Sequence, residues 1–73
     1  MVSKKKYLED GSVGSKDDFQ NPILDIVIDG KTVYGCWAMM SEESFKKYGC
    51  GLGLGLGQKY QIQPDGRWLK IEG

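Results

Sequence analysis

Hydrophobic and polar residues alternate most clearly in the stretch ILDIVIDGKTVYGCWAMM, residues 23–40. Asp29-Gly30 lies between two alternating runs rich in β-branched residues, which is typical of a two-residue hairpin turn with positive φ at both central positions. Such a turn predicts a buried face made by Leu24, Ile26, Val33, Trp37 and Met39. The opposite face is then expected to carry Val27, Thr32, Tyr34 and Cys36.

The next stretch, MSEESFKKYG (residues 40–49), predicts a short helix. Ser41 is a good N-cap, and the two glutamates that follow it suit the positive end of the helix dipole. Two lysines suit the other end, and Gly49 is placed to end the helix in the left-handed region. Phe45 and Tyr48 form a short apolar stripe. Because so short a helix is not stable alone, it is expected to dock on a sheet.

Residues 50–60, CGLGLGLGQKY, admit three interpretations. A dinucleotide-binding loop needs glycines at the first, third and sixth motif positions, and a P-loop needs Gly-Lys-Ser/Thr; neither pattern is present. Flexible linkers use serine rather than three leucines. Even positions from 50 to 62 are mostly apolar, which predicts a strand with its leucines in the core. The glycines on the other face then either allow close packing or form a flat strip without side chains on which a partner can lie.

A second turn follows in QPDGRW, with Asp65-Gly66 at its centre. A two-residue turn there pairs Ile62 with Leu69, Gln63 with Trp68 and Lys59 with Glu72. These partners match in character, as cross-strand neighbours should.

Together these elements predict an α+β fold: a small antiparallel sheet of about four strands (ββαββ) with one short helix, a small closed barrel being the alternative. Residues 1–21 are polar and turn-rich and are expected to be a flexible N-terminal arm. Its lysines at positions 4–6 are expected to be solvated rather than bound to phosphates, because acidic residues follow them. Residues 22–73 then form a single small domain.

Composition limits the function classes further. The chain has 73 residues with ten basic and ten acidic side chains, so it has one modest core and no net field that would recruit nucleic acid or a membrane. It begins without a secretory signal and has only two cysteines, so we expect reduced thiols and a cytoplasmic protein. There is no histidine, the commonest general base and metal ligand.

Catalytic and cofactor chemistry is therefore not expected. A copper(I) site from soft ligands is conceivable, but no Cys-X-X-Cys spacing occurs, and these residues are assigned to the core: Cys36, Met39, Met40 and Cys50. The acidic pairs fall in turns or in the first helical turn, where solvation or the helix dipole accounts for them: Glu9-Asp10, Asp17-Asp18 and Glu42-Glu43. We expect no catalytic residues, no metal and no cofactor.

Aromatic, cationic and amide side chains are expected to gather on the sheet face away from the leucines. The candidate partner-binding residues are Tyr34, Lys59, Gln61, Gln63, Arg67, Trp68 and Lys70. A tryptophan among cations is typical of a protein-binding hot spot and also of surfaces that hold single-stranded nucleic acid.

Because the net charge is zero, the hypothesis is a non-enzymatic protein-binding module of inhibitor or adaptor type. Chains of this size include phage-encoded inhibitors of host machines. A single-stranded nucleic-acid-binding protein using Trp68 is the alternative. An open edge on the third strand would also allow a homodimer.

Overall fold

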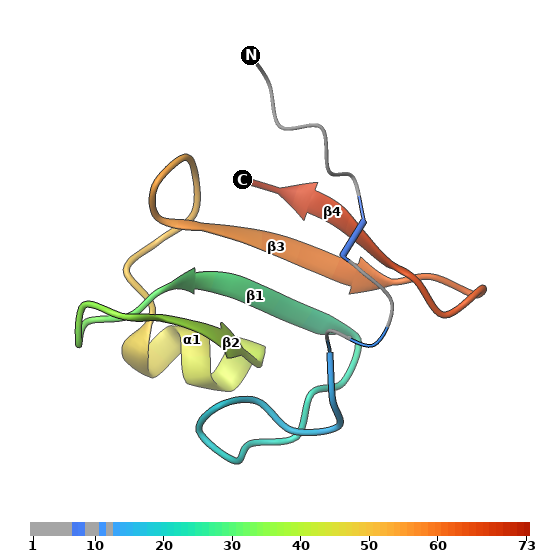
Figure 1. Cartoon of the computed structure of the whole chain (residues 1–73), viewed down its shortest axis with the longest axis horizontal. Helices are drawn as coiled ribbons and strands as arrows, with labels where there is room; N and C mark the ends of the chain where they lie inside the picture. Colours follow the sequence, from blue (N-terminus) through green and yellow to red (C-terminus); the bar gives the residue numbers. More distant parts are fainter. Residues whose placement is uncertain (1–6, 9–10, 12) are drawn as a thin grey trace.

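The chain folds into one antiparallel sheet with a short helix packed on one face (Figure 1). The computed structural model describes residues 7, 8, 11 and 13–73, so the lysines at 4–6 and Glu9-Asp10 lie outside the described residues. The elements, in chain order, are β1 (Ile26–Lys31), β2 (Trp37–Met40), α1 (Glu42–Tyr48), β3 (Gly57–Ile62) and β4 (Trp68–Glu72). The predicted ββαββ order of an α+β domain is confirmed.

The sheet is open, with strand order β2-β1-β3-β4. The pairing of β1 with β3, from Ile26 opposite Gln61 to Gly30 opposite Gly57, joins the two hairpins into one sheet. Strand β3 is therefore flanked on both sides, and the open edge expected on the third strand is not there. The two edges of the sheet are β2 and β4.

The core lies on both faces of the central strands. Val27, Ile28, Met40 and Tyr60 are the buried hydrophobic residues of the described chain. Residues directly opposite in an antiparallel pair share a face, so Ile28 and Met40 lie with Lys59 on the side of α1, where Lys59 approaches Glu42. Val27 and Tyr60 belong to the opposite face. The expected buried face is thus wrong, since Leu24, Val33 and Trp37 are all exposed.

The first hairpin turns later than predicted. Asp29-Gly30 continues β1, and the chain reverses through a three-residue loop between Thr32 and Cys36, with Gly35 at φ +92°. A type I turn followed by a left-handed glycine is the common three-residue solution. Gly30 is needed as a glycine for another reason: a Cβ there would lie 2.9 Å from the Leu56 carbonyl oxygen.

The Gly-Leu run is a loop up to residue 56, and only Gly57–Ile62 form strand β3. The prediction of a strand over 50–62 is wrong because Gly51, Gly53 and Gly55 all adopt positive φ. Such backbone reverses direction and cancels the two-residue alternation that would have put the leucines on one face. Leu54 is 98% exposed as a result.

The second hairpin, β3–β4, forms at the predicted position, but its turn type and strand register differ from the predicted ones. Residues 64–66 form a three-residue loop with Gly66 at φ +89°, and the Gln63 amide donates to the Arg67 carbonyl. Trp68 therefore lies opposite Ile62 rather than Gln63. A bulge restores the predicted pairing of Lys59 with Glu72, which form an ion pair at 3.9 Å.

Helix α1 begins as predicted. The Ser41 hydroxyl accepts from the Ser44 amide at 3.2 Å, and two glutamates occupy the first turn. Gly49 follows the helix but is extended, with φ −77°, and not left-handed. A glycine is needed here because a Cβ would collide with the Phe45 ring.

The segment before β1 is tied to the domain through Asp17, which is only 3% exposed. One carboxylate oxygen accepts from the Phe19 and Asn21 amides, each at 2.9 Å, and the other accepts from the Ser41 amide at 2.8 Å. The Asn21 side chain also donates to the fully buried Ser44 hydroxyl. Asp17 is thus a structural anchor rather than a solvated turn residue. Whether residues 1–21 move in solution stays a prediction.

Burial alone raises the pKa of Asp17, but hydrogen bonds from Ser41, Ser44, Asn21 and Phe19 outweigh it and lower the pKa to about 2. The ionised form is the one that these donors stabilise. Asp17 therefore contributes most of its stabilisation above the pKa of the unfolded chain, near 4.

We predict that Leu54→Ala changes the free energy of unfolding by less than about 0.5 kcal/mol, as exposed positions do. Ile28→Ala, at a fully buried position, should cost about 2–5 kcal/mol. Urea unfolding of the two variants checks this. A large loss of stability in Leu54→Ala would show that the leucine loop packs in the core.

We also predict that Asp17→Asn removes on the order of 2 kcal/mol of stability at pH 7, because the new amide group points a donor at the Ser41 amide. In the unmodified protein this contribution is complete above about pH 4 and is lost as the pH falls toward 2. The variant should show a flatter stability profile across this range, measured by thermal unfolding.

Glu43→Gln, at an exposed helical carboxylate, is the matched control and should keep the steep acid profile. An Asp17→Asn profile parallel to that of the control would contradict the assignment of Asp17 as the anchor.

Candidate functional site

Five large apolar side chains are exposed on the β1–β2 hairpin and the 50–57 loop, two segments at the left of Figure 1. We call this surface the apolar end. Its members are Val33, Tyr34, Trp37, Leu54 and Leu56. Tyr34 is 68% exposed. Large exposed apolar side chains gathered in one region mark interaction surfaces more often than scattered single ones do.

Thr32 shapes the hairpin that presents Tyr34. Its buried hydroxyl donates to the Cys36 carbonyl at 2.8 Å and accepts from the Tyr34 amide at 3.3 Å. The Gly35 amide donates to the Thr32 carbonyl at 2.9 Å and so closes the turn. With its polar groups satisfied internally, this turn holds the Val33 and Tyr34 side chains away from the core.

The hairpin is braced against the end of α1. The Val33 amide donates to the Tyr48 carbonyl at 2.8 Å, and Thr32 pairs with Gly49. The Tyr34 ring lies 5.9 Å from that of Tyr48, which stacks on Phe19 at 4.3 Å. These contacts make the hairpin a supported surface, which suits recognition.

The leucine loop, residues 50–57, forms the other half of the apolar end. Gly53 closes it, because its amide donates to the Gly57 carbonyl and its carbonyl accepts from the Leu56 and Gly57 amides at 3.0 Å. Leu54 and Gly55 are left at the tip. At the base of the loop, the Lys31 amide donates to the Leu56 carbonyl, and the Lys31 carbonyl accepts from the Cys50 amide. The loop is therefore fixed to β1.

The glycines of this loop differ in their surroundings. A Cβ at Gly57 would lie 3.1 Å from the Gly30 Cα and from the Gly51 carbonyl oxygen, so this glycine permits close packing. Gly53 and Gly55 have open space around them and are required by their positive φ. Close packing and sharp turns account for these glycines.

Both cysteines are free and exposed, which contradicts their assignment to the core. The Cys36 sulfur lies 3.6 Å from the Thr32 hydroxyl, and the Cys50 backbone bonds to Lys31. In the described part of the chain, no three metal-ligating side chains gather into a site.

The sequence-derived site residues do not form one surface. Tyr34 belongs to the apolar end. Lys59 and Gln61 lie on the face that carries α1, and the Lys59 ammonium is held between Glu42 at 4.0 Å and Glu72 at 3.9 Å.

Trp68 and Lys70 lie on the opposite face, with Ile62 and Tyr60 as their partners. Gln63 and Arg67 are at the β3–β4 turn, far from Tyr34 (Figure 1). Arg67 pairs with Asp65 at 3.0 Å and stacks over the Tyr7 ring at 4.0 Å. The expected cluster around Trp68 is therefore divided, because the register of β4 differs by one residue from the predicted one. Whether any of these residues meets a partner stays a prediction.

The members of the apolar end missed by sequence reasoning are Val33, Trp37, Leu54 and Leu56. Hydrophobicity and strand periodicity assigned them to the core. One signal in the sequence points the other way: Gly35 and the alternating glycines suit positive φ, and a chain reversal at those positions exposes the intervening side chains.

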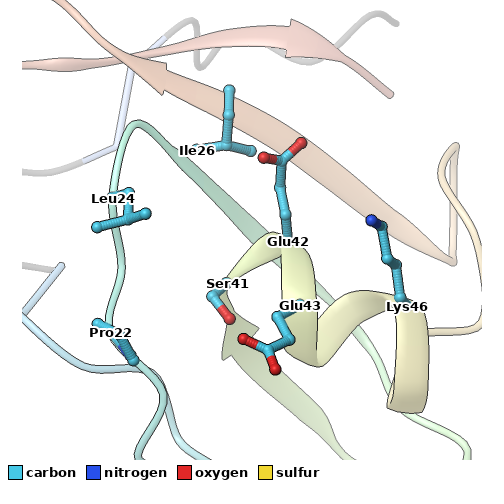
Figure 2. Close-up of a pocket in the computed structure, with 7 residues that line it drawn as sticks. All are labelled: Pro22, Leu24, Ile26, Ser41, Glu42, Glu43 and Lys46. Atoms are coloured by element: carbon cyan, nitrogen blue, oxygen red, sulfur yellow. The ribbon is translucent and has the colours of Figure 1, made fainter.

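A groove lies beside the first turns of α1 (Figure 2). It has a volume of about 410 Å³ and is lined by Pro22, Leu24, Ile26, Ser41, Glu42, Glu43 and Lys46. Figure 2 shows the apolar side chains coming from the segment before β1 and from its first residue, and the charged ones from α1. The groove is thus an apolar floor with a charged border.

Comparisons with protein-family models, curated proteins and solved structures find no match to this chain. In the described residues, no helix has the length and apolar character needed to cross a bilayer.

Proposed function

We propose that this chain is a non-enzymatic protein-binding module, of adaptor or inhibitor type, that contacts its partner through the apolar end. The observation that carries the proposal is the exposure of Tyr34 and Trp37 on a braced hairpin and of Leu54 on a loop at the same end of the sheet. Tyrosine and tryptophan are enriched in binding hot spots, where burying one aromatic side chain supplies much of the affinity.

Support also comes from what holds these side chains out of the core. A single exposed leucine on a surface needs no explanation, but here one hairpin and one loop at the same end of the sheet expose several large side chains. The β1–β2 turn forms hydrogen bonds within itself and to the last residue of α1, and the leucine loop forms them within itself and to β1, so little backbone ordering is required on binding.

The nucleic-acid alternative has less support. Lys59 is engaged with two carboxylates and lies on the other face from Trp68, and Arg67 is engaged with Asp65 and Tyr7. A strand of nucleic acid needs its cations and stacking platform on one path.

We predict that the double variant Tyr34→Ser, Trp37→Ser loses partner binding at least tenfold, about 1.4 kcal/mol, because two central aromatic contacts are removed. Immobilised protein and variant are compared by affinity capture from extracts of the source cell, followed by binding titrations with the captured protein.

The matched control is Leu24→Ser, since Leu24 is 75% exposed but lies before β1, away from the hairpin. It should retain full affinity for that partner. Equal losses in control and variant, or no loss in either, would contradict the apolar end as the binding surface.

A further inference from the structure

The two edges of the sheet differ in how they are covered. At the β2 edge, the Asp18 amide donates to the Met39 carbonyl at 3.1 Å, and the Asp18 carboxylate accepts from the Met39 amide at 2.9 Å. One residue therefore engages both outward-facing backbone groups of Met39, and its side chain ends the pairing. Capping of this kind protects an edge strand against the addition of another strand.

The β4 edge instead pairs with an extended segment of the same chain (Figure 1). Tyr7 lies opposite Leu69 in an isolated antiparallel bridge, and the Leu8 amide donates to the Trp68 carbonyl at 3.1 Å. The Trp68 carbonyl thus points away from β3. Because inward- and outward-facing residues alternate along an antiparallel strand, the backbone groups of Lys70 point outward as well. The edge of β4 is therefore a template that accepts an extended segment through main-chain hydrogen bonds.

Arg67 gives this edge a preference for an aromatic side chain. The Arg67 Cζ lies 4.0 Å from the centre of the Tyr7 ring, which is a cation–π contact. An aromatic residue opposite Leu69 is recognised in this way whichever chain supplies it. The next residue, Leu8, lies opposite Trp68 in the same register, so an apolar residue suits that place.

Lys70 adds a charge preference that the chain's own segment does not meet. In the antiparallel register, the residue before the aromatic one is placed opposite Lys70. Lys70 takes part in none of the ion pairs among the described residues. A carboxylate opposite it is attractive, whereas the residue before Tyr7 in the sequence is Lys6. A segment with Asp or Glu directly before an aromatic residue therefore has an electrostatic advantage over the segment from this chain.

We propose that the β4 edge binds an extended segment of a partner protein as an added antiparallel strand, with an acidic residue directly before an aromatic one and an apolar residue after it. Tyr7 and Leu8 occupy this site in the free protein and are displaced when the partner segment binds. In the described residues, one backbone hydrogen bond and one cation–π contact hold them, and such contacts are weak at a surface.

This edge is a second interaction surface, separate from the apolar end. The β3–β4 turn, where β4 begins, is far from the β1–β2 turn that belongs to the apolar end (Figure 1). The proposal therefore goes beyond the proposed function and does not rest on it.

Two peptides that differ in one charge test the register. Thr-Val-Glu-Tyr-Leu-Thr-Ser carries the acidic residue, and Thr-Val-Lys-Tyr-Leu-Thr-Ser is the matched control, both with blocked termini. In calorimetric titrations of the full chain at low salt, the Glu peptide should bind about three- to tenfold more tightly, because it exchanges a repulsive cross-strand pair for an attractive one. Lys70→Glu should reverse the preference and Lys70→Gln should abolish it, since neither substitution removes the backbone edge.

A second measurement uses the unmodified protein and needs no substitution. The amide chemical shifts of Trp68, Leu69 and Lys70 should move when the Glu peptide is added, while those of β2 should not. Tyr7→Ala removes the aromatic contact of the chain's own segment, so this variant should bind the Glu peptide at least about threefold more tightly and keep the preference for Glu over Lys.

Contrary outcomes overturn the proposal. These are no binding of either peptide up to about 1 mM, equal binding of both, a preference unchanged in Lys70→Glu, or shift changes confined to other strands. An affinity unchanged in Tyr7→Ala would show that the peptide and Tyr7 do not share a site. The variant Tyr34→Ser, Trp37→Ser should bind the Glu peptide like the unmodified protein while it loses the partner of the apolar end, so the failure of either proposal is seen separately.

Discussion

The buried carboxylate of Asp17 is the interaction on which the arrangement of this small domain depends. It gathers backbone amides from its own turn and from Ser41, the N-cap of α1. Asn21 and Ser44 extend the same network, and every buried side-chain polar atom in the described chain has a hydrogen-bond partner. Only four hydrophobic side chains are buried in the part of the chain that the structure describes, so one charge-assisted network contributes a large share of the net stability.

That network also positions α1 and, through it, the β1–β2 hairpin. With the segment before β1 tied to the start of α1, the helix is held over β1 and β2, and its last turn braces the β1–β2 hairpin. The groove lies beside the anchored end of the helix, and the apolar end lies at the other. The groove and the apolar end are therefore presented by the two ends of one seven-residue helix and the segments around it.

Glycine has two separate roles in this chain. Gly30 and Gly57 let the backbones of β1 and β3 come closer together than they could if either residue had a Cβ. Gly35, Gly53 and Gly55 reverse the backbone through positive φ, and each reversal leaves neighbouring apolar side chains in solvent. The same residue type thus closes the sheet and exposes the surface on which the proposed function rests.

The sequence by itself determined the order of elements, the helix from Ser41 and the site of the second turn, because N-capping and turn chemistry act between residues a few positions apart. Only the tertiary structure decided the registers, the β1–β3 pairing and the exposure of Trp37 and Leu54. Those depend on backbone contacts between distant segments, such as Gly30 against Gly57. A two-residue alternation looks the same in a strand and in a loop of alternating glycines until positive φ interrupts it.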